Sequence, residues 1–294
     1  MELSFLGRYI VKPELLLTTN GFKATWNAIE YGAGLAEALQ TKVTLLGVTE
    51  KLNPAAIDDH HPLEDVFERA VSLFKEKGVA YSLEVQDGDA ENIISKKANS
   101  GDFITVVSPL GRPQIRRWLT GRSIRHFMET ISRPILYVPQ VRLPMQRLLI
   151  CVGGLGFEVQ AEDLALQMAL KSQAKVTLLH IIPPVDLDYP TSRLANEHWR
   201  DLINTDTVLG RNLRKAVDTV EAVGLTADVE VRRGHIVEEI DAVLKTGNYD
   251  LLCMGSPYGG NALRQLYAPN VTADIAEAAH CPVLIARAAR EPLL

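Results

Sequence analysis

The chain has 294 residues and a formal net charge of −5, and 47% of its residues are hydrophobic while 23% are charged. This length predicts two domains, and the apolar fraction excludes an intrinsically disordered chain. The acidic balance gives no general attraction to nucleic acid or to an anionic membrane.

The first half alternates between strand-like and helix-like patterns of apolar residues. The expected strands cover residues 15–19, 42–48, 81–85, 103–107 and 134–138. The expected helices start near Trp26, cover 63–77, run from Gly88-Asp89 to about Ala98, and cover 121–131. Strands joined by helices predict a parallel sheet with helices on both faces, and right-handed crossovers predict a doubly wound sheet.

The second half repeats the first. The run that starts at Lys42 recurs at Lys175, the segment from Ser108 to Gly111 resembles that from Ser256 to Gly259, and residues 134–138 resemble 282–286. Ordered matches separated by unlike segments indicate a duplicated domain, because solenoid repeats have much shorter periods. The second copy carries about 15 additional residues near 183–200.

The predicted fold class is therefore α/β, with two tandem doubly wound five-stranded parallel sheets, at residues 1–140 and 146–294, joined by the proline-containing segment 140–146. We expect the two copies to pack together as a pseudo-twofold pair. A further homodimer stays open. A single continuous sheet, or halves of unrelated topology, is expected to rule out two duplicated sandwiches.

Short motifs recur at the expected carboxyl ends of the strands. The first copy contains Thr19-Asn20-Gly21, Asp87-Gly88-Asp89 and the loop Ser108-x2-Gly111-x9-Gly121-Arg122-Ser123. The second contains Val152-Gly153-Gly154, Arg233-Gly234-His235 and, after Gly255, the loop Ser256-x2-Gly259-x9-Pro269-Asn270-Val271. Together these motifs resemble those of the universal stress protein family, once in each copy.

The resemblance implies a Rossmann-like fold related to the adenine nucleotide alpha hydrolases. It also implies that the last strands, 134–138 and 282–286, pair with each other and cover two sheet edges, since last strands commonly pair in the family. Some members of the family bind ATP and others do not, so the resemblance makes ATP the candidate cofactor. A glycine-rich loop and a helix N-terminus suit phosphate groups physically. The residues at matching positions in the first copy are Thr19, Asn20, Val48, Ser108, Gly111, Gly121, Arg122 and Ser123. Those in the second copy are Gly153, Ile181, Gly255, Gly259 and Asn270.

Both copies depart from the family pattern. Asn20 stands where the family has Asp, and Ser108 stands where it has Gly, so the first copy is either a modified nucleotide pocket or a vestigial loop. In the second copy Gly153 lacks the acidic side chain and Pro269 removes a backbone donor. If a nucleotide binds, we expect it in the first copy. The turn of glycines from Gly153 lacks a complete phosphate-loop motif and predicts only a tight turn.

Five arginines, without an acidic residue among them, lie between Phe103 and Met128. They are either an anion site or a solvated loop, and they are Arg112, Arg116, Arg117, Arg122 and Arg125. Nucleic acid is not the expected partner, because aromatic residues do not alternate with these arginines.

The remaining histidines, acidic residues and cysteines give weaker support for a functional site. His60-His61 beside Asp58-Asp59 predicts a solvated loop or helix start, with no metal site. The three cysteines form no CxxC pair, which suits a reducing compartment, and Cys151 and Cys253 lie in apolar runs typical of a core. No run approaches about 18 apolar residues and the first residues lack a signal-peptide pattern, so we expect a cytoplasmic protein without a membrane span.

The sequence shows no nucleophile elbow, Walker loop or HExxH motif, so an enzyme is not the expected class. The resemblance implies a stress-response protein that acts by binding and association, with degenerate nucleotide pockets. The alternative is an ATP-binding switch, or a slow ATPase, that uses the first copy. An adenylating ligase ranks last, because its His-x-Gly-His and Ser-Gly-Gly-x-Asp-Ser motifs are missing.

Overall fold

The structure, a computed structural model, describes residues 13–50, 61–110, 123–152, 159–182, 199–256 and 271–287. Its first half contains β1 (Glu14–Thr19), η1 (Lys23–Thr25), α1 (Trp26–Leu39), β2 (Val43–Thr49), α2 (Leu63–Glu76), β3 (Tyr81–Asp87), α3 (Ala90–Asn99), β4 (Phe103–Val107), α5 (Ser123–Thr130) and β5 (Ile135–Tyr137). Within these ranges no helix combines the length and apolar character needed to span a bilayer.

The second half follows the same alternation, with one additional helical segment. It contains β6 (Arg147–Cys151), α6 (Val159–Ser172), β7 (Lys175–Ile182), η3 (Trp199–Asn204), α8 (Val208–Ala222), β8 (Ala227–Arg233), α9 (Ile236–Gly247), β9 (Leu251–Ser256), α11 (Val271–Ala278) and β10 (Val283–Arg287). The segment η3 lies at the end of the expected insertion. The prediction of strands and helices in the first half is confirmed, with ends that differ by a few residues.

Local chemistry sets several of these helix ends. The Asp89 carboxylate accepts a hydrogen bond from Asn92 N at 3.1 Å and caps α3. The Thr207 hydroxyl accepts from Gly210 N at 3.0 Å and caps α8. Such caps satisfy amide groups that have no partner inside the helix.

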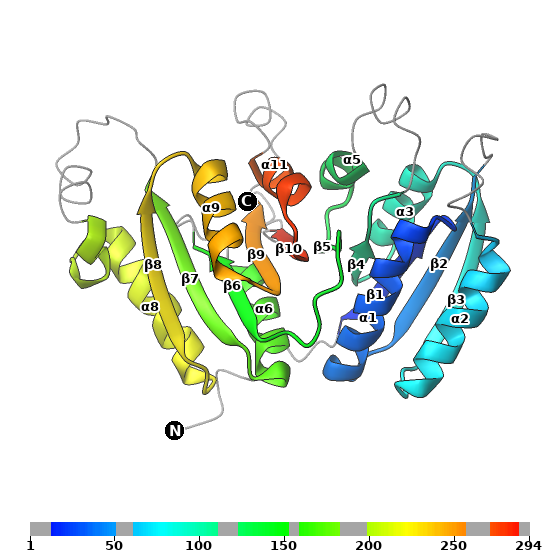
Figure 1. Cartoon of the computed structure of the whole chain (residues 1–294), viewed down its shortest axis with the longest axis horizontal. Helices are drawn as coiled ribbons and strands as arrows, with labels where there is room; N and C mark the ends of the chain where they lie inside the picture. The colour runs from blue at the N-terminus through cyan, green and yellow to red at the C-terminus, as the bar shows by residue number, and fades with distance from the viewer. Residues whose placement is uncertain are drawn as a thin grey trace, which may run out of the picture.

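All ten strands of the described residues form one sheet in the order β3-β2-β1-β4-β5-β10-β9-β6-β7-β8 (Figure 1). Each half is parallel, and the order in one half is the mirror of the order in the other. The halves join where β5 pairs with β10 in antiparallel fashion, with Leu136 opposite Leu284. The predicted pairing of the last strands is therefore confirmed.

This join also makes the sheet continuous, which differs from the picture of two separate sheets. The criterion that a continuous sheet rules out duplication was wrong, because the continuity arises from the pairing of the last strands that the family resemblance predicts. The matching strand orders of the two halves are the stronger observation. The α/β fold of two tandem five-stranded units is confirmed, whereas the domain limits stay a prediction.

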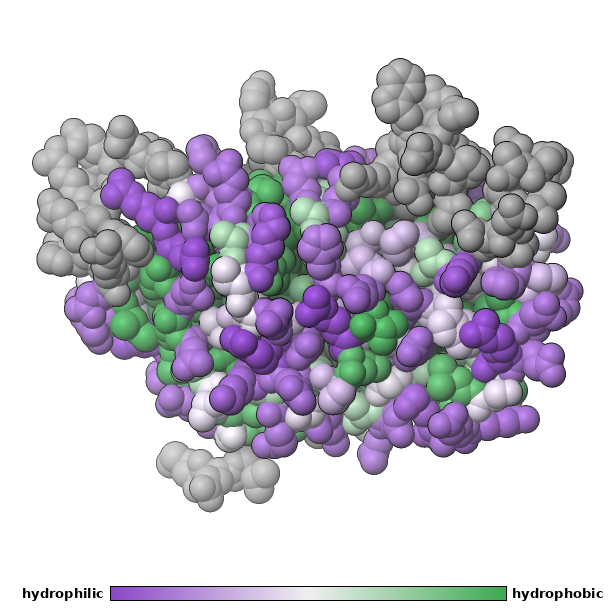
Figure 2. All heavy atoms as spheres, in the orientation of Figure 1, coloured by the Kyte–Doolittle hydropathy of each residue, from purple (hydrophilic) through white to green (hydrophobic). Residues whose placement is uncertain are grey.

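Both faces of the sheet are covered by apolar cores that cross from one half to the other. Helices α1, α2, α6 and α8 cover one face, and α3, α5, α9 and α11 cover the other. The surface seen in Figure 2 is largely hydrophilic, with hydrophobic side chains in small separate patches. Most apolar side chains are thus used inside the molecule.

Candidate functional site

The first half has a topological switch point at β1, where the direction of the strand order reverses. This strand lies between β2 and β4, and the chain moves outward on one side for β2 and β3 and on the other for β4 and β5. In open α/β sheets a ligand crevice lies at the carboxyl ends of the strands where this direction reverses. Asn20 follows β1 and Ser108 follows β4, so the structure brings these two predicted site residues to this place.

The turn after β1 is built by its own hydroxyl groups. The hydroxyls of Thr19 and Thr25 lie 2.6 Å apart, and Thr25 Oγ1 donates to Phe22 O at 2.6 Å. Thr19 Oγ1 also accepts from Gly21 N at 3.1 Å, and Gly21 has a φ of 83° that favours glycine. The Thr19 side chain therefore shapes the turn.

The side chain of Asn20 is held by a residue that the sequence analysis missed. Asn20 is 1% exposed, and its Nδ2 donates to Glu50 Oε2 at 2.8 Å. The other carboxylate oxygen, Glu50 Oε1, accepts from Ala90 N at 3.1 Å, at the start of α3. Asn20 Oδ1 is buried and has no hydrogen-bond partner. Glu50 follows β2 directly, and a polar residue at that position was the signal that could have found it.

Ser108 and Val48 are both buried. The Ser108 hydroxyl donates to Val138 O at 2.8 Å, and so ties the end of β4 to the segment after β5. Val48 belongs to the core on the face of α3 and α5. Their side chains therefore have structural roles, and any contact of theirs with a ligand stays a prediction.

The loop residues of the predicted sites are not described. Gly111, Gly121, Arg122, Gly153, Gly259 and Asn270 lie outside the described residues, and Ser123 is described only as the first residue of α5. The predicted phosphate-binding part of either site is thus untested.

The second half differs from the first at the corresponding strand ends. Its buried His180 replaces Gly47 of the repeat, and His180 Nδ1 lies 2.6 Å from Val152 O, just after β6. At Gly47 a Cβ atom would come within 2.8 Å of Phe67, so glycine lets α2 pack closely on β2. Ile181 is half-buried, and Gly255 pairs with Ala286 inside the sheet. These described residues present no counterpart of the pair formed by Asn20 and Glu50.

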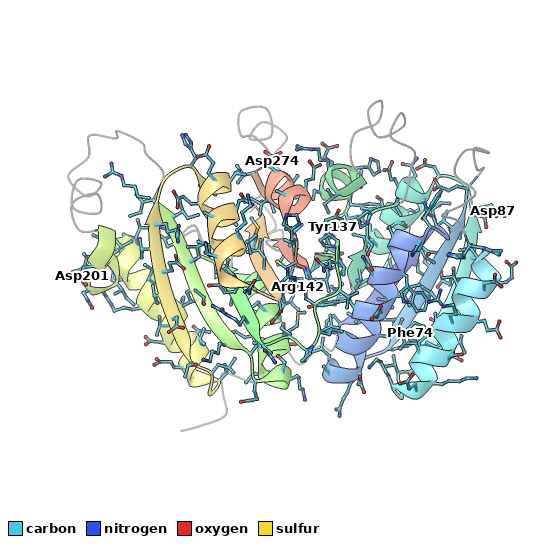
Figure 3. All side chains as sticks on the ribbon, viewed as in Figure 1. Phe74, Asp87, Tyr137, Arg142, Asp201 and Asp274 are labelled. Atoms are coloured by element: carbon cyan, nitrogen blue, oxygen red, sulfur yellow. The ribbon has the colours of Figure 1, made fainter. Side chains whose placement is uncertain are left out.

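Arg125 joins the two halves. From α5 it forms ion pairs with Asp274 and with Glu277 of α11, the latter at 2.9 Å, and these contacts raise its pKa. Figure 3 shows Asp274 beside the join. Arg125 thus lies in a helix and is paired with carboxylates of the same chain. The prediction of an anion site or a solvated loop is wrong for this residue. Arg112, Arg116 and Arg117 lie outside the described residues.

The described cysteines and histidines offer no reactive or metal-binding group. Burial raises the pKa of the Cys151 thiol to about 12 and that of Cys281 to about 11, and Cys253 is fully buried. A reactive cysteine needs the opposite shift. In the described part of the chain, no three His, Cys, Asp or Glu side chains are placed to hold a metal ion. His61 is exposed, and its backbone N donates to Gly21 O at 2.8 Å.

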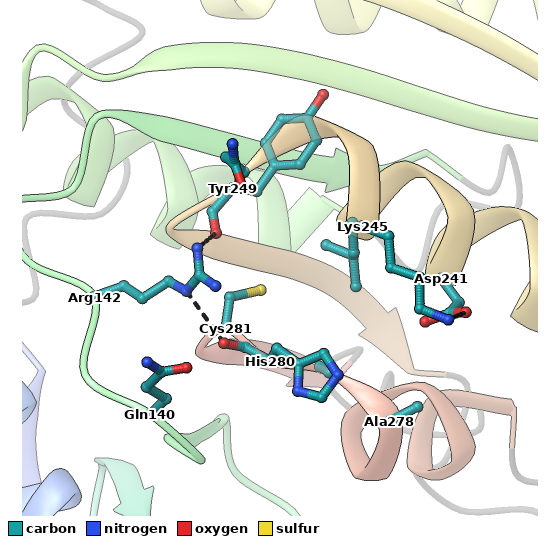
Figure 4. A pocket seen from close by; sticks show the side chains of 11 residues that line it. Gln140, Arg142, Asp241, Lys245, Tyr249, Ala278, His280 and Cys281 are labelled. Carbon is teal, nitrogen blue, oxygen red and sulfur yellow. Dashed lines mark hydrogen bonds and ion pairs between the residues drawn. The ribbon is translucent and has the colours of Figure 1, made fainter.

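A cavity of about 370 Å³ lies away from the switch point of the first half (Figure 4). It is lined by the ends of α9 and α11, which precede β9 and β10, and by Gln140 and Arg142 of the segment that links the halves. There Arg142 donates to His280 O at 3.1 Å and to Tyr249 O at 3.4 Å, at the carboxyl ends of two helices. Lys245 is paired with Asp241. Arg142 already donates to carbonyl groups at two helix ends, and Lys245 is paired with a carboxylate. We therefore interpret this cavity as part of the junction between the halves and not as the ligand site.

Comparisons with known proteins agree with the repeated fold. The sequence model of the universal stress protein family matches residues 145–287. A universal stress protein from Archaeoglobus fulgidus is 15% identical, with a TM-score of 0.68 over 94% of this chain and 96% of its own. A functionally unknown protein from Pseudomonas aeruginosa is 14% identical, with a TM-score of 0.63 over 93% and 92%. A search of curated proteins finds no match.

Likeness at these identities shows the fold alone. The cytoplasmic domain of a prokaryotic cation chloride cotransporter has a TM-score of 0.50 at 12% identity, over 94% of this chain and 95% of its own. The same fold thus serves in a protein of a different kind, and function must be argued from the site. Residues 145–287 thus match the sequence model of the universal stress protein family, and the first half repeats the topology of that segment.

Proposed function

We propose that the protein acts by binding a small ligand and by association, without catalysis, and that the ligand site is the crevice of the first half. The observation that carries this proposal is the buried Asn20 Oδ1, an acceptor without a donor at the switch point of the sheet. A buried polar atom left unpaired costs about 1–3 kcal/mol, and a ligand that donates to it recovers that cost.

The ligand that fits the family pattern best is an adenine nucleotide. The first copy keeps Gly111 and Gly121 at the spacing of the family's phosphate loop, and Asn20 still offers an acceptor. In the second copy Gly153 and Pro269 remove the corresponding groups, so we expect that half to be a structural partner with a degenerate pocket. A role in the stress response and a cytoplasmic location follow from the family and complete the proposal.

The alternative is a switch, in which ATP shifts an equilibrium between two conformations. It requires that ATP bind one conformation more tightly than the other. A slow hydrolysis of ATP would accompany it only if a base activates water. Glu50, the carboxylate that contacts Asn20, is already engaged by Asn20 and Ala90.

Thermal denaturation with and without magnesium and ATP tests the proposal. Binding to the native state stabilises it by about 2.7 kcal/mol at a ligand concentration of 100 Kd, so the midpoint should rise. The matched variants Gly111→Val and Gly259→Val separate the two halves, and only the first should lose the shift. No shift at millimolar ATP would overturn the nucleotide proposal. Release of phosphate at a steady rate would favour the ATPase alternative.

A further inference from the structure

The outer strand of the first half, β3, has an open edge with apolar side chains. We infer that β3 of one copy pairs in antiparallel fashion with β3 of a second copy of this chain, so that the protein forms a twofold homodimer with one continuous sheet. Such a dimer is the association part of the proposed function, on which the inference rests, and it does not use the residues of the ligand crevice.

The backbone and the side chains of β3 both leave this edge open. β3 and β8 are the outer strands of the sheet that the described residues form (Figure 1). On β3, Leu83 is 41% exposed and Val85 is 56% exposed. Ala80 O and Gly88 N bond to β2, and successive residues of a strand direct their backbone groups to opposite sides. The N–H and C=O groups of Leu83 and Val85 therefore point away from β2, where a further strand can pair with them.

The second half shows the same place covered. The strand registers match Leu83 with Val229 of β8, and Val85 with Val231. Both valines are half-buried, and they pack on the core together with Ile203 of η3, which contacts β8. Among the described residues of the first half, no helical segment takes this place on β3.

The first half also lacks the residues that hold η3. At Gly210 of α8 a Cβ atom would collide with Thr205 O, and Arg214 donates to that oxygen at 2.9 Å. The turn glycines before β3 and β8 extend the alignment into the helices. Glu64 of α2 then replaces the glycine, and Glu68 replaces the arginine. Because a bulky side chain and a carboxylate cannot serve in this way, the edge suits a strand better than a segment like η3.

A register centred on Leu83 makes β3 complementary to itself. Leu83 then lies opposite its own copy, and Tyr81 lies opposite Val85 of the second copy. An aromatic residue opposite a β-branched one is a favourable cross-strand pair. On the other face of the sheet Ser82 lies opposite Glu84, whereas a register centred on Glu84 would place two carboxylates opposite each other.

The helix α2 carries complementary charges beside this pairing. Phe74 of α2 contacts Tyr81, and α2 runs back along β3, so the middle of α2 lies level with Leu83 and the twofold axis. Glu68 and Lys75 are exposed and lie about two turns apart on one side of α2. The symmetry brings Glu68 of each copy toward Lys75 of the other. Charges of opposite sign at such places favour one orientation of the partners.

Symmetry closes the assembly at two copies. Pairing of β3 with itself is isologous and leaves no second β3 edge, and η3 already packs beside β8 at the other end of the sheet. The chain uses the same kind of contact inside itself, because β5 and β10 pair in antiparallel fashion with Leu136 opposite Leu284.

Sedimentation equilibrium of the full chain over a range of concentrations tests the interface. We expect a monomer–dimer equilibrium, and Val85→Lys should raise its dissociation constant about tenfold or more, because a charge would be buried at the interface. Val208→Lys, at a residue that is 61% exposed at the start of α8, is the matched control and should change nothing. A monomer at every concentration, or a dimer that Val85→Lys leaves unchanged, would overturn the inference.

A charge exchange tests the orientation of α2. Glu68→Lys and Lys75→Glu each place like charges opposite each other, and each should weaken the dimer about threefold. The double variant restores opposite charges and should recover the affinity of the original protein. Lack of recovery would overturn the arrangement about the twofold axis.

Amide hydrogen exchange separates strand pairing from contacts of side chains alone. The amides of Leu83 and Val85 should exchange slowly in the concentrated dimer and rapidly in dilute protein, whereas those of Ser82 and Glu84, which face β2, should be protected in both. Rapid exchange at Leu83 and Val85 in the dimer would overturn strand pairing. None of these measurements needs ATP, so the dimer and the nucleotide site can each fail without the other.

Discussion

At the scale of single residues, His180 and Gly47 occupy corresponding positions of β7 and β2 but have different structural roles. Glycine at position 47 makes room for Phe67, whereas His180 forms a buried hydrogen bond with the carbonyl of Val152. That bond ties β7 to the chain just after β6, close to the place where the second copy would hold a ligand. His180 therefore stabilises the second half at the point where we propose a degenerate pocket.

Replacing His180 by Leu tests this role. The Val152 carbonyl would lose its partner in a buried place, so the free energy of unfolding should fall by about 1–3 kcal/mol. Urea denaturation followed by circular dichroism measures the change. The control is Lys175→Gln at the exposed start of the same strand, which should have almost no effect. Equal effects of both variants would show that the hydrogen bond contributes little.

The buried cysteines give the protein a dependence on high pH. Burial raises the pKa of Cys281 from 9.0 to about 11, so the folded state disfavours the thiolate. The stability that follows from the neutral thiol is complete below pH 9.0 and is lost as the pH rises through about 11. We expect the free energy of unfolding to fall over this range, and Cys281→Ala to make the fall shallower. Guanidinium titrations at several pH values measure it.

The same burial predicts slow chemistry at the described thiols. At pH 8 a disulfide reagent should label the buried Cys253 and Cys281 only after denaturation. Cys151 is partly exposed and should react slowly, because its raised pKa leaves little of the reactive thiolate. Rapid labelling of the native protein at any of the three would mean that its surroundings open readily.

At the scale of elements, the pair α5 and α11 links the halves on one face of the sheet. Arg125 on α5 meets two carboxylates on α11, and its side chain is 39% exposed. Ion pairs of this exposure contribute little individually, but one arginine that serves two carboxylates has a fixed geometry. These ion pairs therefore help to fix how α5 and α11 are oriented, beside the antiparallel pair of β5 and β10.

Substituting Arg125 by Met should lower the free energy of unfolding by about 1 kcal/mol at low ionic strength. The difference should shrink in about 1 M salt, because salt screens partly exposed charges. Denaturation curves at two salt concentrations check this. Arg133→Met is the control, since Arg133 pairs with Asp102 inside the first half and both are more exposed. A salt-independent loss would point to packing and not to charge.

At the scale of the whole molecule, one sheet and two cores unite the halves. Residues of both halves belong to the same core cluster on each face, and separation would expose the edges of β5 and β10. Unpaired edges and exposed apolar faces are unfavourable in water. The two copies should therefore behave as one cooperative unit although they arose as a repeat.

Calorimetry tests that cooperativity. A single transition, in which the calorimetric and van't Hoff enthalpies agree, is expected for the intact chain. Two separate transitions, with a folded half surviving the first, would show that the join at β5 and β10 is weak. Saturating ATP should move one transition as a whole if the first half binds it.

Most of the fold could be predicted from the sequence, whereas the candidate site could be predicted only in part. Period and spacing predicted the strands and helices of the first half and the repeat, and the family resemblance predicted the pairing of the last strands. The position of Asn20 and Ser108 at strand ends followed from the same pattern. The partner of Asn20 did not, because Glu50 lies 30 residues away and meets it only when β1 and β2 lie side by side.

The sequence by itself determined which face of each element is buried, because hydrophobic periodicity is a local property. Only the tertiary structure decided which polar side chains meet. Arg125 and Asp274 are 149 residues apart, and no local pattern carries that contact. Hydrogen bonds and ion pairs depend on distances of a few ångströms between distant segments, which are set by the packing of the whole sheet.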